Sequence, residues 1–145
     1  MKDKLEEINS VNGVKTSFIY FNDGETVYAN MPQGFDEATY VEIARDVIQV
    51  AAMFDRLSTP LHEYDLKYDN GRVIAYPMSN FNLIILCQPN VSVAMLRLTV
   101  NVALADLEAD KKFQKRLSKV EASRRSFLVR SNMDAESWAL VEVVN

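Results

Sequence analysis

The chain has 145 residues, the size of one compact domain with a short extension. Hydrophobic residues make up 48% and charged residues 25%, which excludes an intrinsically disordered chain. A single cysteine and a single histidine exclude an intrachain disulfide and a cysteine-built zinc site. The charged N-terminal residues lack the apolar run of a signal peptide, and no stretch is apolar enough to span a membrane, so we expect a soluble cytoplasmic protein.

Charge divides the sequence into three regions. Residues 1–108 carry 8 Lys and Arg against 15 Asp and Glu, residues 109–130 carry 8 against 2, and residues 131–145 carry 3 acidic residues and none basic. Because an acidic body repels the phosphate backbone, we expect no nucleic-acid partner. The basic residues 111–125 are either a solvated helix face or a patch for an acidic partner or a peripheral membrane contact, and the first reading is the more common for such a block.

The N-terminal third predicts a short helix, a hairpin and a long helix. Residues 3–9 favour a helix that ends at Asn12-Gly13. Residues 14–21 and 25–31 are rich in β-branched and aromatic residues, and Asn22-Asp23-Gly24 between them predicts a tight turn. Asp36 is a candidate N-cap of a helix that runs to about Leu57.

The long helix 36–57 is apolar on more than one face. One stripe at helical spacing comprises Tyr40, Ile43, Ala44, Val47, Ala51 and Phe54, and a second beside it comprises Val41, Ile48 and Ala52. One stripe is enough to cover a sheet, so we expect this helix to contact two surfaces.

Three strands and a further helix are predicted next. Residues 62–69 alternate, with Tyr64, Leu66 and Tyr68 on one face and charged residues on the other, which is typical of a half-exposed edge strand. Asn70-Gly71 predicts a hairpin to residues 72–78. The continuously apolar residues 83–87 are typical of a central strand covered on both faces.

The segment after the last strand fits two structures. Residues 91–108 alternate like a strand but also carry helical stripes, one of them Leu96, Val100, Ala103 and Leu107; length and alanine content favour a helix. Residues 109–124 then continue or restart it as a basic helix. The last residues, 125–145, form either short strands or a helix capped by Asp134, and Trp138 predicts that this extension docks on the domain or on a second copy.

This order of elements gives an α+β domain with a largely antiparallel sheet. Together with Gly13-Val14, TSFIYF, Asn22-Asp23-Gly24, Met31-Pro32, the helix 36–57 and the run from GRVIAYP to VNVALADL, it resembles the roadblock domain family over about residues 1–108. The resemblance implies a five-stranded, mainly antiparallel sheet with helices on both faces. Residues 109–145, a basic helix and an apolar C-terminal segment, extend beyond such a domain.

The resemblance also implies a function and an interface. Family members scaffold or regulate Ras-like small GTPases, as bacterial polarity proteins do, and form homodimers, or heterodimers with a paralogue, through the edge strand and the long helix. The interface residues expected here are Tyr64, Leu66, Tyr68, Val47, Ala51 and Phe54. Acidic residues of the long helix are expected to meet a basic partner face; they are Glu42, Asp46 and Asp55.

Enzyme chemistry finds little support. The phosphate-binding GxxxxGK[ST] and the GxGxxG, HExxH and GxSxG patterns are absent, so we expect no enzymatic activity, cofactor or metal. Cys87 lies in the most apolar strand and is expected to be an inert core thiol, and His62 an ordinary surface residue. The alternating carboxylates Glu63, Asp65 and Asp69 include Lys67 and favour a solvated face over a metal site.

The sequence assigns no catalytic arginine and leaves two other functions open. A GTPase activator can supply an arginine, but nothing marks Arg45, Arg56, Arg72 or Arg97 for a catalytic role. A ligand-sensing pocket under the long helix is an alternative function, with an aromatic lining of Tyr20, Tyr28, Phe35, Tyr40 and Tyr76, although aromatics at this spacing are more often core. A chaperone-type dimeric binding module is a third.

Overall fold

The computed structural model describes residues 1–30, 34, 37–57 and 61–123, without the side chain of Asp55. In chain order its elements are α1 (Lys2–Asn9), β1 (Val14–Phe21), β2 (Thr26–Tyr28), α2 (Glu37–Arg56), β3 (Tyr64–Tyr68), β4 (Gly71–Pro77), β5 (Phe81–Cys87) and α3 (Val93–Ala109). Residues 111–123 form a further helix after α3. The predictions for Pro32, Phe35, Asp36, Asp134 and Trp138 lie outside the described residues.

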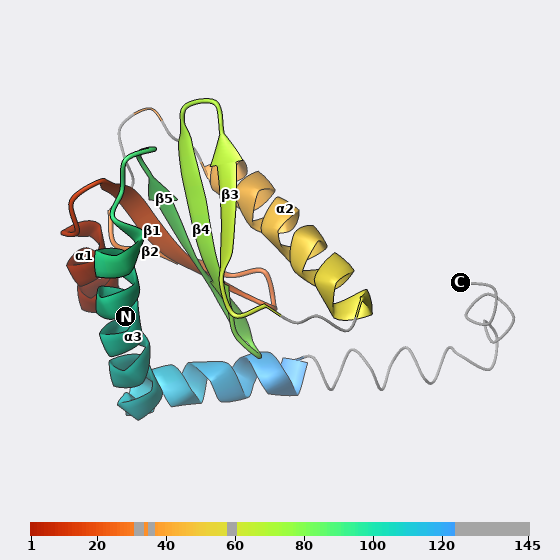
Figure 1. Ribbon diagram of the computed structural model, residues 1–145. Helices are drawn as coiled ribbons and strands as arrows, with labels where there is room; N and C mark the ends of the chain where they lie inside the picture. The colour runs from red at the N-terminus through yellow and green to blue at the C-terminus, as the bar shows by residue number, and fades with distance from the viewer. Residues whose placement is uncertain (31–33, 35–36, 58–60, 124–145) are drawn as a thin grey trace, which may run out of the picture.

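The five strands form one sheet in the order β2-β1-β5-β4-β3, and every pairing is antiparallel. The apolar β5 lies in the middle, with all seven residues buried, because helices cover both of its faces (Figure 1). The polar β3 lies at one edge and pairs with β4 alone. The central position of residues 83–87 and the edge position of residues 62–69 are therefore confirmed.

Each face of the sheet has its own core. On one face Ile84 and Leu86 of β5 pack with Tyr40, Ala44 and Val47 of α2. On the other face, the alternate residues of β5 pack against α1, α3 and the helix 111–123. The α+β class, the five-stranded antiparallel sheet and the placement of helices on both faces are confirmed.

The ambiguous segment 91–108 is a helix. The Ser92 side chain caps α3 by accepting a hydrogen bond from the Met95 amide at 3.4 Å, which satisfies one of the free amides of the first turn. The stripe predicted to be apolar is the one that faces the core: Leu96, Val100, Ala103 and Leu107 are buried.

The helix 111–123 restarts after a break at Asp110. The backbone of Asp110 is extended, and its side chain accepts hydrogen bonds from the Lys112 and Phe113 amides at 2.8 and 3.2 Å, so it caps the new helix. Phe113 is 1% exposed and packs edge-on against Phe81, with 5.1 Å between ring centroids. The helix is thus part of the core on the α3 face.

An arginine on the same helix ties it to the β1–β2 turn. Arg116 forms ion pairs with Asp23 and Glu25, and its guanidinium lies over the Phe21 ring, 4.4 Å from the centroid. In Figure 1 this helix runs beneath one end of the sheet, in a direction different from that of α3.

Candidate interaction surface

The edge strand β3 is the first part of the candidate surface. Within the described residues only β4 pairs with it, so the backbone groups on its other side are not used by another strand of the sheet. It is a regular five-residue strand, with no proline or bulge to blunt the edge. Such an edge is a template for pairing with another chain.

The long helix α2 runs beside this edge. The Phe54 and Tyr64 rings lie 5.8 Å apart, and near the other end of β3 the Asp46 carboxylate lies close enough to Tyr68 to affect its hydroxyl. Burial raises the pKa of Tyr68, and the Asp46 charge raises it further. These contacts show which side of α2 borders β3.

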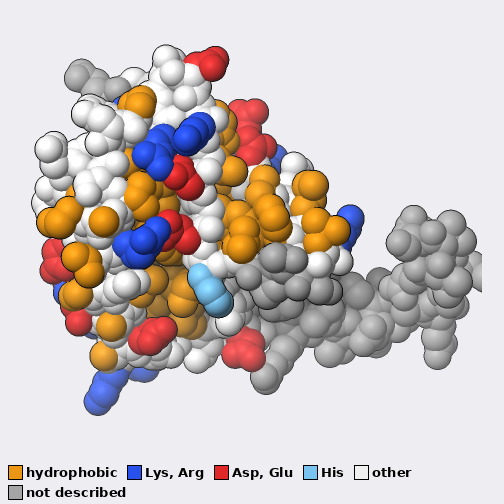
Figure 2. Space-filling model, in the orientation of Figure 1, with side chains coloured by type: hydrophobic (Ala, Val, Ile, Leu, Met, Phe, Trp, Pro, Cys, Tyr) orange, Lys and Arg blue, Asp and Glu red, His pale blue; other side chains and the backbone are white. Residues whose placement is uncertain are grey.

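That side of α2 is exposed and largely apolar. Asp46, Val50, Met53 and Leu57 follow one another at helical spacing and continue the border with β3; we call them the α2 flank. The Met53 and Leu57 side chains are 62% and 70% exposed. Figure 2 shows the resulting apolar surface over α2, next to the β3 edge. An edge strand and an exposed apolar flank therefore lie side by side.

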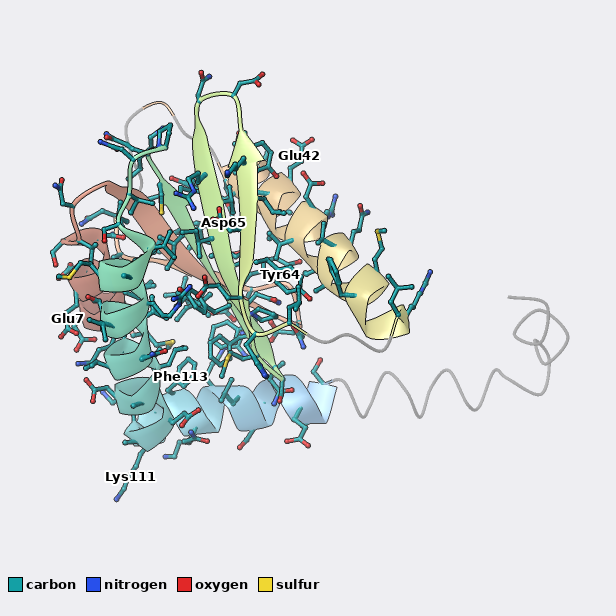
Figure 3. All side chains as sticks on the ribbon, viewed as in Figure 1. Glu7, Glu42, Tyr64, Asp65, Lys111 and Phe113 are labelled. Atoms are coloured by element: carbon teal, nitrogen blue, oxygen red, sulfur yellow. The ribbon has the colours of Figure 1, made fainter. Side chains whose placement is uncertain are left out.

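The interface residues expected from sequence do not all reach this surface. Val47 is fully buried and Tyr64 is 4% exposed, so the side chains of both belong to the core of a single chain. Figure 3 shows Tyr64 between β3 and α2. Ala51, Phe54 and Leu66 are half-buried against the same core, while Tyr68 is exposed.

The residues that sequence reasoning missed are Val50, Met53 and Leu57. The predicted stripe was the one spent on the protein's own sheet, and the second predicted stripe, with Ile48 and Ala52, lies on the side of the helix away from β3. Positions 50, 53 and 57 also form an apolar series at helical spacing. The sequence does not show that this series lies beside the edge strand β3; the structure does.

Two of the acidic residues expected to meet a partner are exposed on α2. Glu42 and Asp46 are exposed, and in Figure 3 Glu42 projects from the first half of α2 away from the sheet. The side chain of Asp55 is not among those described. Arg45 and Arg56 are exposed on the same helix. A charged rim therefore borders the apolar flank.

On the opposite face, β3 is tied down by ion pairs. The Arg97 guanidinium of α3 donates to both oxygens of Glu63 at 3.0 and 2.9 Å, and Arg72 of β4 pairs with Asp65. These hydrogen bonds lower the pKa of both carboxyl groups. Glu63 and Asp65 are therefore occupied by arginines, and among the described residues no group of three or more His, Cys, Asp or Glu side chains is placed to hold a metal ion.

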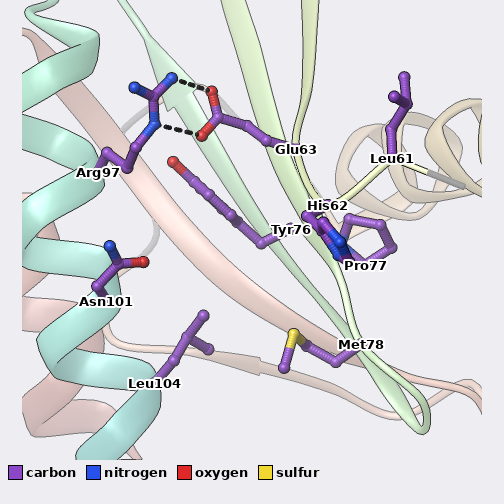
Figure 4. Close-up of a pocket in the computed structure, with 9 residues that line it drawn as sticks. All are labelled: Leu61, His62, Glu63, Tyr76, Pro77, Met78, Arg97, Asn101 and Leu104. Atoms are coloured by element: carbon purple, nitrogen blue, oxygen red, sulfur yellow. Dashed lines mark hydrogen bonds and ion pairs between the residues drawn. The ribbon is translucent and has the colours of Figure 1, made fainter.

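A hollow of about 470 Å³ lies between α3 and the chain around the start of β3 (Figure 4). Leu61, His62, Met78 and Leu104 contribute to its walls, and the Glu63–Arg97 pair closes one side. The Tyr76 hydroxyl points towards that pair. Burial raises the pKa of Tyr76, and the Glu63 charge adds to the effect.

The aromatic residues proposed as an alternative pocket lining under the long helix pack as core where they are described. Phe18, Tyr28 and Tyr40 pack against each other under α2 with centroids 5.0 to 5.6 Å apart, so these rings are core. Tyr76 belongs to the core on the other face of the sheet. The aromatic residues predicted as one lining are therefore divided between two cores.

The remaining candidates behave as ordinary structural residues. Cys87 is 1% exposed, and burial raises the pKa of its thiol to about 11, so the reactive thiolate is scarce at neutral pH. Lys111 points away from the domain in Figure 3, and Lys112, Lys115 and Lys119 are also exposed. In the part of the chain that is described, no helix combines the length and hydrophobicity needed to cross a membrane.

Comparison with known proteins identifies the fold. No family model matches the sequence, and no curated protein does. The structure is similar to a Roadblock/LC7 domain from Streptomyces avermitilis, with a TM-score of 0.59 and 11% identity over 75% of this chain and 95% of that one. It is also similar to Myxococcus xanthus MglB, with a TM-score of 0.58 and 14% identity over 72% and 85%, and to an MglB with a tetrameric arrangement, with 0.59 and 13% over 79% and 88%. The chain therefore has the roadblock fold.

Proposed function

We propose that the protein is a non-enzymatic adaptor or regulator that dimerises through β3 and the α2 flank and binds a small Ras-like GTPase. The observation that carries the proposal is the open β3 edge beside the exposed Met53 and Leu57. Monomeric proteins rarely leave a regular edge and an apolar patch next to each other.

A two-fold axis beside β3 would satisfy both features at once. Antiparallel pairing of two β3 strands would continue the sheet across the two protomers, and each α2 flank would then meet its copy. Tyr68 and Leu66 would lie next to the joined strands on the α2 side, and Val50, Met53 and Leu57 would lose their contact with water. The proposed interface thus keeps Tyr68, Leu66, Ala51 and Phe54 from the sequence prediction and replaces Val47 and Tyr64.

A charge placed on the flank tests the dimer. Met53→Glu should shift the mass measured by light scattering at micromolar concentration from that of a dimer to that of one chain, because the new carboxylates would face each other across the axis. The matched control is Ala52→Glu, an exposed position on the side of α2 away from β3. A monomeric parent protein, or a dimer that both variants leave intact, would contradict the interface.

The GTPase part of the proposal rests on the fold and on the composite surface. The roadblock resemblance implies partners of this class, and two of the similar solved structures are of MglB. Two α2 helices side by side would form one broad surface, with Glu42 exposed on each copy. These carboxylates would attract a basic partner face and accelerate encounter.

The decisive experiment is a pull-down with the full chain from lysates of its source cells, followed by binding measurements with GTP- and GDP-loaded forms of any GTPase recovered. Glu42→Lys should slow association by roughly tenfold at low salt, with little change in dissociation. Glu6→Lys, a charge reversal on α1 at the other face, is the control and should have no effect. Recovery of no GTPase would refute the partner class.

The hollow beside Arg97 favours a second candidate, a small-ligand sensor. Its volume exceeds the ~300 Å³ at which ligand sites begin. Native mass spectrometry of the purified chain tests this: a bound small molecule that is lost in Leu104→Trp, a substitution that narrows the hollow, would support a sensor. Mass equal to the bare chain would remove that reading.

A further inference from the structure

The outer face of α3 carries a second apolar surface. Met95, Leu98 and Val102 are 59%, 64% and 59% exposed, and Ala105 is exposed in line with them. We call these four residues the α3 seam. It lies on the opposite face of the sheet from α2, so the proposed β3 dimer leaves it uncovered (Figure 1).

The spacing of the α3 seam is that of a helix-pairing surface. Its residues follow at intervals of three, four and three, as at the a and d positions of a coiled coil. The buried stripe that includes Leu96 and Val100 faces the sheet on the opposite side of the same helix. A narrow apolar stripe with polar neighbours is suited to one further helix rather than to a broad surface.

We propose that the α3 seam is a contact between two copies of this chain, packed antiparallel about a two-fold axis at the level of residue 100. The contact does not rest on the proposed GTPase partner or on the β3 dimer. Its occupant is inferred from the sizes and the charges of the residues along α3.

The sizes favour the antiparallel arrangement. Leu98 and Val102 lie equally far from residue 100 along the helix, and so do Met95 and Ala105. An antiparallel pair would therefore place Met95 opposite the Ala105 of its copy and Leu98 opposite Val102, which fills each layer to a similar extent. A parallel pair would place methionine against methionine and alanine against alanine, crowding one layer and leaving a void in the other.

The charges favour the same arrangement. Asp106 and Glu108 flank the seam near the C-terminal end of α3, and Asp106 is bound by Lys4 at 3.0 Å. In an antiparallel pair these carboxylates would lie beside the first turn of the copy's α3, where the helix dipole attracts negative charge. In a parallel pair they would face each other and repel.

The same charges disfavour another segment of this chain as the occupant. Residues 131–145 carry 3 acidic residues and none basic, so docking on the seam would bring them against Asp106 and Glu108. A second copy of α3 meets no such repulsion, because its N-terminal half carries Arg97 and no acidic residue.

Cross-linking tests the arrangement. Leu98→Cys and ¹⁵N-labelled Val102→Cys chains are mixed and oxidised with copper phenanthroline, and the isotope labels identify the pairs joined by a disulfide. We expect the mixed 98–102 product to exceed the 98–98 and 102–102 products by roughly tenfold. A disulfide forms only when the two Cα atoms lie within about 7 Å, and the antiparallel pair brings only residues 98 and 102 that close. Lys119→Cys in place of Val102→Cys is the control and should give no mixed product. Dominant 98–98 cross-links, or no mixed product, would overturn the proposal.

Association of the full chain provides an independent measurement. Between roughly 10 and 1,000 μM, the average mass from sedimentation should rise about twofold in the parent protein and stay flat in Leu98→Glu, because one helix pair is smaller than a standard interface and binds weakly. Leu98 is exposed, so the variant should fold normally. An identical concentration dependence in both proteins would overturn the proposal, as would a change in Trp138 fluorescence in dilute Leu98→Glu, which would make the extension the occupant.

Discussion

The two faces of the sheet are closed by different forces. On the α1 and α3 face, charged side chains link helices to strand ends and turns: Arg97 binds Glu63, and Arg116 binds Asp23 and Glu25. On the α2 face, the contacts are apolar and aromatic, such as Phe18 with Tyr40 and Phe54 with Tyr64. Ion pairs fix the position of one helical layer, whereas α2 lies over its core with one flank left exposed.

The two faces therefore differ in how firmly their helices are held and in how much apolar surface is exposed beside the β3 edge. Directional pairs fix the relative positions of the elements that they join, so the α3 face provides a rigid support for the sheet. Exposed apolar side chains such as Met53 contribute little to a single chain but gain free energy when a second surface covers them. The two proposed contacts therefore differ in their support, because the α2 flank lies on a layer held by apolar packing and the α3 seam on a layer held by ion pairs. Three predictions test how far this contrast holds.

The largest effect is expected from the helix 111–123. Phe113→Ala should lower the free energy of unfolding by about 3–5 kcal/mol, because the ring fills a buried space against Phe21 and Phe81. Urea denaturation measures it, with the exposed Lys112→Ala as control. A loss below about 1 kcal/mol would mean that this helix is peripheral to the α3 layer.

A smaller loss of stability is expected when either of two loop glycines, Gly13 or Gly34, is replaced by alanine. Gly13 has φ +94°, and a Cβ there would lie 2.9 Å from the Val91 Cα. Gly34 has φ +90°, and a Cβ there would have no atom of the described residues within 4 Å. Gly13→Ala should therefore cost about 2 kcal/mol or more, and Gly34→Ala only the backbone strain of about 1–2 kcal/mol. Equal losses in thermal unfolding would show that the Val91 backbone adjusts freely.

The smallest effect concerns the Glu63–Arg97 pair. Arg97 lowers the pKa of Glu63 from its ordinary value of 4.5, so the pair stabilises the fold above that pH and the benefit is lost as pH falls through the lower, folded-state pKa. Glu63→Gln should cost at most about 1 kcal/mol at pH 7, because Arg97 is half-exposed to water.

The deficit of the same variant should shrink between pH 7 and pH 3, because protonation of Glu63 removes the charge that Arg97 binds. Urea midpoints at the two pH values measure the difference, and Glu42→Gln on α2 is the control. A deficit that persists unchanged at pH 3 would assign the loss to packing rather than to charge.

Local patterns predicted the elements well. The apolar residues 83–87 form the central strand, the alternating residues 62–69 contain the edge strand, and Ala103 and Ala105 correctly favoured a helix. The sequence also contains a signal for the helix 111–123, because Asp is a preferred N-cap residue and its side chain accepts a hydrogen bond from the amide three residues later, here that of Phe113. These features depend only on neighbouring residues.

Relations between distant segments could not be predicted in this way. Helical spacing identified Val47 as apolar but not which stripe of α2 would meet the sheet, so a core residue was assigned to an interface. Tyr76 was grouped with Tyr40 although the sheet separates them. Arg116 lies 93 residues from Asp23 in sequence, and nothing local to either residue indicates their contact.

The buried position of Cys87 makes its thiol a natural probe of local unfolding. It is the only cysteine of the chain and lies in the central strand, where burial holds the pKa of the thiol near 11. A thiol reagent can therefore modify the native chain only when β5 is transiently exposed. The rate of modification then measures how often the structure opens around Cys87. Without any engineered label, the rate would separate fluctuations that uncover the middle of the sheet from fraying at β3, which leaves Cys87 silent.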